Sequence, residues 1–386
     1  MIKDIQHIQV DYARDRYAAH PRQGGIFHFG GGEVAIIYFR APCRYAEQND
    51  VSHGPQGYKG RAQTVLARSL DGGATWDRSR DVVVYDETRP AEERREFLNQ
   101  VKANRDVPRA KIDLNSRDTA IFFGRTWMNK DEPLKYLCFA VRSADRGRTW
   151  EGVPTPVDPP LGLDPVHKDG HPPVAMPDGT HLAAMTAGGR VWLYASDDHG
   201  LGWEPVAKIC SDPTGLGNPT YAGLILLPSG RLQCYSLHIG GWRDAIQMNY
   251  SDDGGYSWSE PQPIVRWGQS PWAAKRHPAA LAGPAISGKG KHYRSPWALR
   301  LRDGRIVVLF ARRRQPRGIG LILSEDDGRS WSAQHVLRDD ASGEDIGYPV
   351  AVELEPGLIF AAYYYMLDDG NGFGGTRFIA GMHFRI

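Results

Sequence analysis

The chain has 386 residues with 47 Lys and Arg against 45 Asp and Glu, which gives a formal net charge of only +2. A charge so close to balance provides no strong field for nucleic acid or for a membrane surface, so neither is expected as a partner. The four cysteines lie far apart, and no Cys-x-x-Cys or His-Glu-x-x-His pattern occurs, so no metal site and no cofactor is predicted.

The N-terminal segment lacks the apolar stretch of a signal peptide. No apolar run in the chain approaches the length that spans a membrane. These two features predict a cytoplasmic location, with removal of a secretion signal as the alternative.

Six segments share the pattern of a β-hairpin, in which a short strand, a tight turn and a second strand follow one another. Two insertions interrupt the series. Residues 86–108 have a helical pattern, and residues 259–292 are rich in Pro, Gly and Ala and are expected to form a loop. The hairpin segments are 27–37, 112–123, 174–185, 224–235, 298–310 and 350–363.

Each of the first five hairpins is followed by a second repeat, whose pattern is Ser-x-Asp-x-Gly-x-Ser/Thr-Trp. Asp and Gly suit the backbone of a tight turn, and Trp can anchor the strand that returns from it. The third copy has Gly202 at the Ser/Thr position. Repetition at these spacings indicates one supersecondary unit that is used several times. The copies span residues 69–76, 143–150, 196–203, 251–258 and 324–331.

These copies resemble the Asp boxes of the sialidase (neuraminidase) superfamily, in which they are structural markers on the outside of a β-propeller. The resemblance covers nearly the whole chain and implies one sialidase-like domain over residues 1–386. Together with the six hairpins it predicts an all-β fold, a six-bladed β-propeller. A strand within residues 5–10 is expected to join the C-terminal blade and close the ring, and a seven-bladed ring is the alternative.

The topology of such a propeller places the hairpin turns and the Asp boxes on one rim, so a site is expected on the opposite rim, at the mouth of the central channel. Proline marks this opposite rim, because a missing N–H is tolerated where the first strand of a blade begins. The residues that precede these prolines are expected around the mouth. They are His20, His171, Asn218, Ser295 and Tyr348.

Sialidases hold the substrate carboxylate with three arginines, use an Asp as the acid, and use a Tyr activated by a Glu as the nucleophile. The resemblance therefore implies that Asp50 is the acid and Tyr348 the nucleophile. It also implies that Arg243 and Arg317 are two of the three arginines. Arginine suits this role because its planar guanidinium group can donate two hydrogen bonds to one carboxylate or sulfate.

Two parts of that site are missing from the matching segments. Residues 18–21 read Ala-Ala-His-Pro where an arginine is expected, and residues 218–221 read Asn-Pro-Thr-Tyr where a glutamate is expected. A phenol is a weak nucleophile without a base beside it. Histidine titrates near neutrality, so His20 or His171 could supply that base. Asp50 lies on a long loop that could exclude water, which would raise the pKa of its carboxyl towards that of a general acid.

The predicted site therefore combines candidate catalytic residues with candidate substrate-binding residues. The catalytic candidates are Asp50, His171, Tyr348 and His20. The substrate-binding candidates are Arg44, His53, Tyr221, His238, Arg243, Arg317 and Asp345.

The function that this set predicts is that of a carbohydrate-active enzyme whose partner is an oligosaccharide. The leading hypothesis is a glycoside hydrolase for an acidic or uncommon sugar, distinct from an ordinary sialidase. One alternative is a polysaccharide lyase, in which His or Tyr removes a proton beside a uronate carboxylate that arginine neutralises. A second alternative is a propeller that binds glycans without catalysis. The sequence leaves the oligomeric state open.

Overall fold

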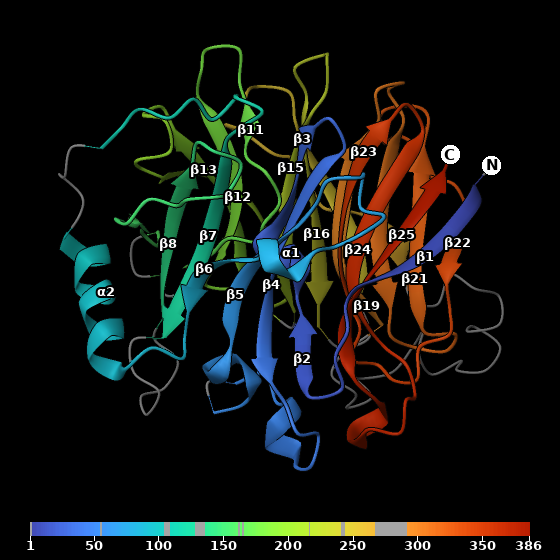
Figure 1. The fold of residues 1–386 in the computed structure, drawn as a ribbon. Helices are drawn as coiled ribbons and strands as arrows, with labels where there is room; N and C mark the ends of the chain where they lie inside the picture. Colours follow the sequence, from blue (N-terminus) through green and yellow to red (C-terminus); the bar gives the residue numbers. More distant parts are fainter. Residues whose placement is uncertain are drawn as a thin grey trace.

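The strands form six sheets arranged as the blades of a β-propeller (Figure 1). The computed structural model describes residues 2–54, 56–103, 109–127, 136–160, 163, 166–215, 217–240, 244–266 and 292–386. The prediction of an all-β, six-bladed fold is confirmed.

The two ends of the chain meet in one blade. β1 (Lys3–Asp11) pairs antiparallel with β25 (Arg377–Arg385), and the sheet continues through β24 (Leu358–Met366) to β23 (Gly347–Glu355). Figure 1 shows β1 and β25 side by side, with both termini at this blade. Closure of the ring by an N-terminal strand is therefore confirmed, and backbone hydrogen bonds hold the first and last segments together.

The other five sheets follow in chain order. The first contains β2 (Arg16–Ala19), β3 (Gly25–Gly30), β4 (Glu33–Pro42), β5 (Gln63–Ser69) and β6 (Val82–Asp86). The second contains β7 (Ala120–Trp127), β8 (Tyr136–Ser143) and β9 (Thr155–Val157). The third contains β10 (Val166–His167), β11 (Val174–Ala175), β12 (His181–Ala187), β13 (Arg190–Ser196) and β14 (Glu204–Ser211).

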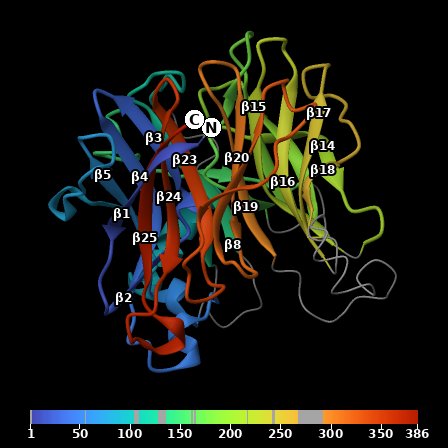
Figure 2. The same ribbon diagram turned by 90° about the vertical axis from the view of Figure 1, so that its right-hand side faces the viewer.

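The fourth and fifth sheets are regular four-stranded blades. The fourth contains β15 (Asn218–Leu226), β16 (Leu232–Ile239), β17 (Ala245–Ser251) and β18 (Gln262–Arg266). The fifth contains β19 (Tyr293–Arg300), β20 (Ile306–Arg312), β21 (Gly318–Ser324) and β22 (His335–Arg338). Figure 2 shows β19 and β20 between the closing blade and the blade of β15 and β16. Neighbouring blades cover both faces of the inner strands, which is why β24 is buried from Ile359 to Met366.

The predicted hairpin at 112–123 forms only its second strand, because residues 111–119 make turns instead. The Asp113 carboxylate accepts a hydrogen bond from the Asn115 amide at 2.9 Å, and the Thr119 hydroxyl donates to the Asp113 carbonyl at 2.7 Å. Such side-chain bonds to the local backbone compete with strand pairing.

The insertion at 86–108 contains the predicted helix, α2 (Ala91–Ala103), on the outside of the molecule (Figure 1). The Phe97 ring fixes this helix to the second blade, 5.0 Å from the Phe139 ring. The prediction of a loop at 259–292 is wrong for its first part, because residues 262–266 form β18 and pair with β17, and residues 267–291 lie outside the described residues. Among the described residues, no helix has the length and apolar character needed to cross a membrane.

Hydrogen bonds show why the repeats form the turns between third and fourth strands. In the fourth copy the Asp253 carboxylate accepts from the Ser251 hydroxyl at 2.7 Å and from the Ser257 amide and hydroxyl at 3.0 and 2.6 Å. The Trp258 indole N–H donates to the Gly255 carbonyl at 2.9 Å. The copies around Asp71, Asp145 and Asp326 repeat the serine and carboxylate bonds. The repeat therefore closes its own turn.

The rim opposite these turns carries the loops that position the candidate site. Near the mouth lie α1 (Pro21–Gly24) and two short helices in the loop of residues 43–62, η1 (Gln48–Val51) and η2 (Tyr58–Arg61). Another short helix, η5 (Gly372–Gly374), lies between β24 and β25, whereas η3 (Arg78–Arg80) precedes β6. In Figure 1 the blue loop with η1 and the red loop with η5 both lie at the lower end.

We expect Asp71→Ala to lower the melting temperature at neutral pH by a few degrees, because the turn loses the bonds of the carboxylate to Ser69 and Thr75. Burial by itself would raise the pKa of Asp71, but the hydrogen bonds from Ser69 and Thr75 outweigh this effect and lower the pKa to about 2. The stabilisation is thus present above about pH 4 and is lost as the pH falls towards 2. Thermal melts at pH 7 and pH 2.5 measure both effects. Leu70→Ala in the same turn is the control, and an equal loss at both pH values would contradict this account.

Candidate active site

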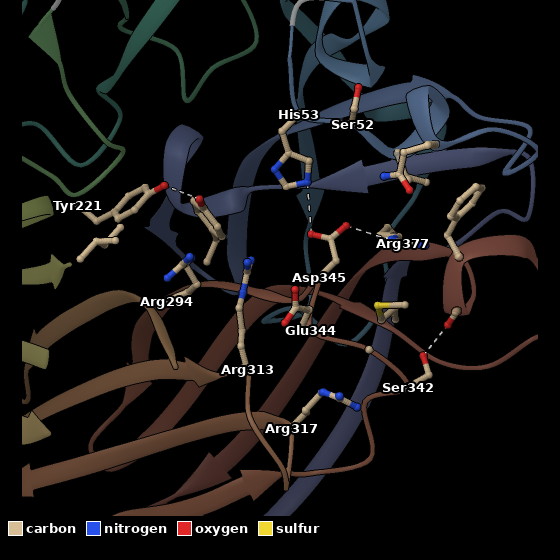
Figure 3. Close-up of a pocket in the computed structure, with 18 residues that line it drawn as sticks. Ser52, His53, Tyr221, Arg294, Arg313, Arg317, Ser342, Glu344, Asp345 and Arg377 are labelled. Atoms are coloured by element: carbon tan, nitrogen blue, oxygen red, sulfur yellow. Dashed lines mark hydrogen bonds and ion pairs between the residues drawn. The ribbon is translucent and has the colours of Figure 1, made fainter. Parts of the chain in front are cut away.

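A cavity of about 760 Å³ opens at the rim that carries these loops. It is lined by the loop with η1, by the first residues of β15, β19 and β23, and by the segments before β21 and β25. Figure 3 shows the side chains converging on one space from these separate blades. The polar residues that line it include Ser52, His53, Tyr221, Arg294, Arg313, Arg317, Glu344, Asp345, Tyr348 and Arg377.

Four blades begin with a non-glycine residue in the left-handed region of the backbone. The φ angles are 61° at His20, 53° at Tyr221, 42° at Ser295 and 56° at Tyr348. Three of these residues coincide with breaks in strand pairing at the starts of β15, β19 and β23. Such bulges redirect side chains, and residues strained in this way gather at functional sites. The repeated bulge is the device that turns blade-opening side chains towards the mouth.

Tyr348 and Tyr221 form a hydrogen-bonded pair at the cavity wall, with their hydroxyl oxygens 2.5 Å apart (Figure 3). Burial raises the pKa of Tyr348 well above 10, and the nearby Tyr221 and Tyr364 add to the shift. Tyr348 is therefore protonated at neutral pH and can donate its proton. The residue of blade four that contacts Tyr348 is thus a tyrosine, whereas the sialidase resemblance implied a glutamate.

His53 and Asp345 lie next to each other in the cavity wall, with His53 Nε2 3.3 Å from Asp345 Oδ1 (Figure 3). The Tyr17 hydroxyl lies 2.6 Å from Asp345 Oδ2 and 3.0 Å from His53 Nε2. The hydroxyl has one proton, which it donates to the carboxylate, so its oxygen accepts from His53 Nε2–H. The proton of neutral His53 therefore sits on Nε2, and Nδ1 keeps a lone pair that can accept a proton.

The Asp345 carboxylate is the centre of this network. Besides Tyr17 and His53, it accepts from the Tyr364 hydroxyl at 2.8 Å and from Arg377 Nε at 3.1 Å. Burial alone would raise the pKa of Asp345, but the hydrogen bond from His53 and the charges of Arg313 and Arg377 outweigh it. The pKa of Asp345 lies well below its ordinary value, so the group is ionised and orients His53.

Four arginines line the cavity together with two carboxylates, Glu344 and Asp345. Arg313 donates to the Tyr364 hydroxyl at 2.6 Å and to the Ile346 carbonyl at 2.9 Å. Arg294 donates to the Tyr293 carbonyl at 2.7 Å, and Arg317 has a buried Nε without a partner among the described residues. The excess of positive charge and the unused donors suit an anionic group on a ligand.

Five of the predicted site residues line this cavity: His53, Tyr221, Arg317, Asp345 and Tyr348. Arg243 lies outside the described residues. His20 is fully buried beside the cavity, with its ring edge-on to Tyr348 at a centroid distance of 4.4 Å, and burial lowers its pKa well below 6.5. It therefore contacts the tyrosine without being one of the lining residues.

Asp50 does not line the cavity, although its neighbours in the loop do. Its carboxylate accepts hydrogen bonds from the amides of Ala46 and Glu47 at 3.0 and 3.2 Å and so caps its own turn. These bonds lower the pKa of Asp50. The prediction of a raised pKa is wrong, because the loop encloses the carboxylate with its own N–H groups rather than with apolar surface.

His171, Arg44 and His238 are also absent from the lining. His171 is buried, donates from Nε2 to the Ala298 carbonyl at 3.0 Å and packs against Trp297, and burial lowers its pKa to about 3. Arg44 is exposed, and His238 lies 3.3 Å from the Asp212 carboxylate. The structure thus brings neither His171 nor His238 into the cavity, since His171 is held by β19 of the fifth blade and His238 by the Asp212 carboxylate, which follows β14.

Sequence analysis missed Arg294, Arg313, Arg377 and Tyr17 as site residues. Arg294 directly precedes Ser295-Pro296, so the proline pattern contained a signal for it. Arg313 lies in the run of three arginines at 312–314, where only the structure shows which side chain turns inward. Within the described residues, no group of three or more His, Cys, Asp or Glu side chains is placed to hold a metal ion.

Residues 60–360 match the family model described as the BNR repeat-like domain. The chain belongs to this family. The match includes all five Asp boxes and the second to fifth blades in full, so the family assignment rests on the repeated blades rather than on one motif. No curated protein shows significant sequence similarity to the chain.

Solved structures of low sequence identity share the fold of this BNR repeat-like protein. A protein of unknown function from Dyadobacter fermentans matches with a TM-score of 0.71 at 20% identity, over 100% of this chain and 99% of the other. The NanB sialidase of Streptococcus pneumoniae matches with a TM-score of 0.60 at 14% identity, over 98% and 70%. The α-L-arabinofuranosidase Arb93a of Fusarium graminearum matches with a TM-score of 0.59 at 14% identity, over 98% and 97%. The predicted sialidase-like propeller is confirmed, and glycosidases of more than one type share it.

We expect Asp345→Ala to lower the free energy of unfolding by about 3–5 kcal/mol, because it leaves buried arginine and tyrosine donors without their acceptor. Urea unfolding at pH 7 measures the loss, and Asp345→Asn, which keeps one acceptor oxygen, is the matched variant and should lose less. Because the pKa of Asp345 is lowered, the contribution of its charge is present above about pH 4 and falls away in more acidic solution. Unchanged unfolding of Asp345→Ala would show that this network does not stabilise the fold.

Proposed function

We propose that this protein is a carbohydrate-active enzyme, a glycoside hydrolase for a sugar that bears an acidic group. The observation that carries the proposal is the combination of four arginines with the His53–Asp345 pair and the Tyr348–Tyr221 pair in one cavity. Glycosidases among the structural neighbours share the fold, which is compatible with this reaction class.

In this proposal the arginines bind the acidic group of the sugar and fix the ring in the cavity. His53 Nδ1 removes a proton from a water molecule, whose oxygen attacks the anomeric carbon. Tyr348 donates its proton to the glycosidic oxygen as the bond to that carbon breaks. The Tyr221 hydroxyl hydrogen-bonds to the phenolate that remains, and the proton on His53 returns to Tyr348 through solvent. Asp50 and His171, which were predicted to be catalytic, have no role in this mechanism.

A polysaccharide lyase is a second candidate, and the same two groups support it. His53 is held as a proton acceptor, and Tyr348 is buried as a neutral proton donor. Removal of a proton beside a carboxylate and protonation of the leaving oxygen need this same pair, with arginine to neutralise the carboxylate. The two candidates differ in whether water enters the product.

We expect a screen of acidic oligosaccharides to give products that contain one added water for each bond cleaved, as measured by mass spectrometry. The panel comprises 3′-sialyllactose and tetrasaccharides of polygalacturonate, alginate, hyaluronan and chondroitin sulfate. Unsaturated products without added water would assign the lyase reaction instead. Binding without any product would indicate a glycan-binding propeller. The absence of both binding and product would contradict the proposal. Little or no turnover of aryl sialosides is expected, because no carboxylate base is hydrogen-bonded to Tyr348 within the described residues.

We expect His53→Gln to lower kcat by about 10²–10⁴-fold, the usual contribution of a positioned acid or base. Tyr17→Phe should lower kcat less and alter its pH profile, because His53 Nε2–H loses one of its two acceptors. Initial rates over pH 5–9 on the substrate that the screen identifies measure both effects. His335→Gln, on the outer strand β22, is the control. Full activity of His53→Gln would remove His53 from the mechanism.

A further inference from the structure

One large apolar side chain at the cavity is held in a strained conformation. Phe373, at the centre of η5, has φ 58° and ψ 30°, in the left-handed region that bulky residues rarely adopt. Glycines flank it on both sides, at positions 372, 374 and 375. The turn therefore has glycine on both sides, but a phenylalanine at a position where glycine would be free of strain.

The rest of the turn fixes this conformation. The Asn371 side-chain amide donates to the Arg14 carbonyl at 2.8 Å and to the Thr376 hydroxyl at 2.7 Å. The Ser342 hydroxyl donates to the Gly374 carbonyl at 2.6 Å. Strained residues persist where the surroundings determine them in this way, and they concentrate at sites that clamp a ligand.

The Phe373 side chain is 39% exposed although it lines the cavity. Among the described residues its ring contacts no other aromatic ring, whereas Tyr17, Tyr348 and Tyr364 are packed against neighbouring rings. A strained residue is normally retained where its side chain makes buried contacts that offset the strain. The side chain of Phe373 makes few such contacts. Its apolar face is available to a ligand.

The turn of Phe373 lies away from the tyrosine pair. Ser342, which is bonded to Gly374, lies in Figure 3 on the opposite side of Asp345 from Tyr221. Arg313 and Arg317 lie between the two sides in this view. A ligand that reached both Tyr348 and Phe373 would therefore extend across the arginines.

We propose that Phe373 is a stacking platform for a second sugar ring, so that the substrate is an acidic oligosaccharide rather than a monosaccharide glycoside; this inference rests on the function proposed above. The C–H face of a pyranose ring is apolar, and an aromatic ring offers it a large contact area with few rotatable bonds to fix. The left-handed backbone holds the ring in place before the ligand arrives, which reduces the entropy lost on binding.

The test is Phe373→Gly, because glycine adopts φ 58° without strain. The melting temperature should stay the same or rise, whereas affinity for a tetrasaccharide should fall by about 10- to 100-fold, as expected for loss of a buried aromatic contact. Isothermal titration calorimetry uses the five oligosaccharides of the screen together with the corresponding monosaccharides. Affinity for the monosaccharides should not change. Phe373→Tyr, which keeps an aromatic ring, should retain binding, and Tyr256→Gly, at an exposed aromatic on the opposite rim, is the control.

The outcomes separate the two proposals. If the wild-type protein binds one of the five oligosaccharides and Phe373→Gly binds it equally well, the platform is excluded while the proposed function remains. If none of the five binds to the wild-type protein, the proposed function fails and the platform fails with it. A lower melting temperature of Phe373→Gly together with unchanged binding would assign Phe373 to the stability of the turn and would also overturn the platform.

Discussion

The carboxylate of Asp345 joins parts of the chain that are far apart in sequence. Its donors come from Tyr17 on β2, His53 in the loop after β4, Tyr364 on β24 and Arg377 at the start of β25. A carboxylate buried among these groups is tolerated only because its oxygens are paired with donors and nearby positive charge. The first and the closing blades must therefore be in register before this network can form. The geometry of the candidate site therefore depends on closure of the ring by β1.

Polar side chains have different roles on the two rims of the propeller. On the rim of the Asp boxes, each carboxylate satisfies the turn in which it lies, so the bonds are local and repeated. At the mouth, arginines, tyrosines and a histidine from several blades share few carboxylates, and several blade-opening residues have positive φ angles. Unbalanced charge and strained backbone lower stability, and proteins retain them mainly where a ligand makes use of them.

The propeller fold by itself leaves the reaction open. A sialidase and an arabinofuranosidase share this fold with the protein, with TM-scores of 0.60 and 0.59. The chemistry must therefore be argued from the mouth, where a tyrosine contacts Tyr348 and a His–Asp pair faces the same cavity. This arrangement supports proton transfer by His53 and Tyr348, rather than the carboxylate-activated tyrosine that the resemblance to sialidases implied.

The sequence by itself determined the propeller, because Asp boxes and hairpins are local patterns that recur with each blade. It also indicated the rim of the site and five residues that line the cavity, since blade-opening prolines and strand order fix which end of each blade faces the mouth. It could not select the acid–base groups. Asp50 and His53 lie three residues apart in one loop, yet only His53 reaches the cavity, because the Asp50 carboxylate caps the turn that precedes it, at Ala46 and Glu47. Likewise the sequence does not show which arginine of the run 312–314 turns inward. Those choices depend on side-chain contacts between blades that are distant in sequence, and only the closed ring brings these residues together.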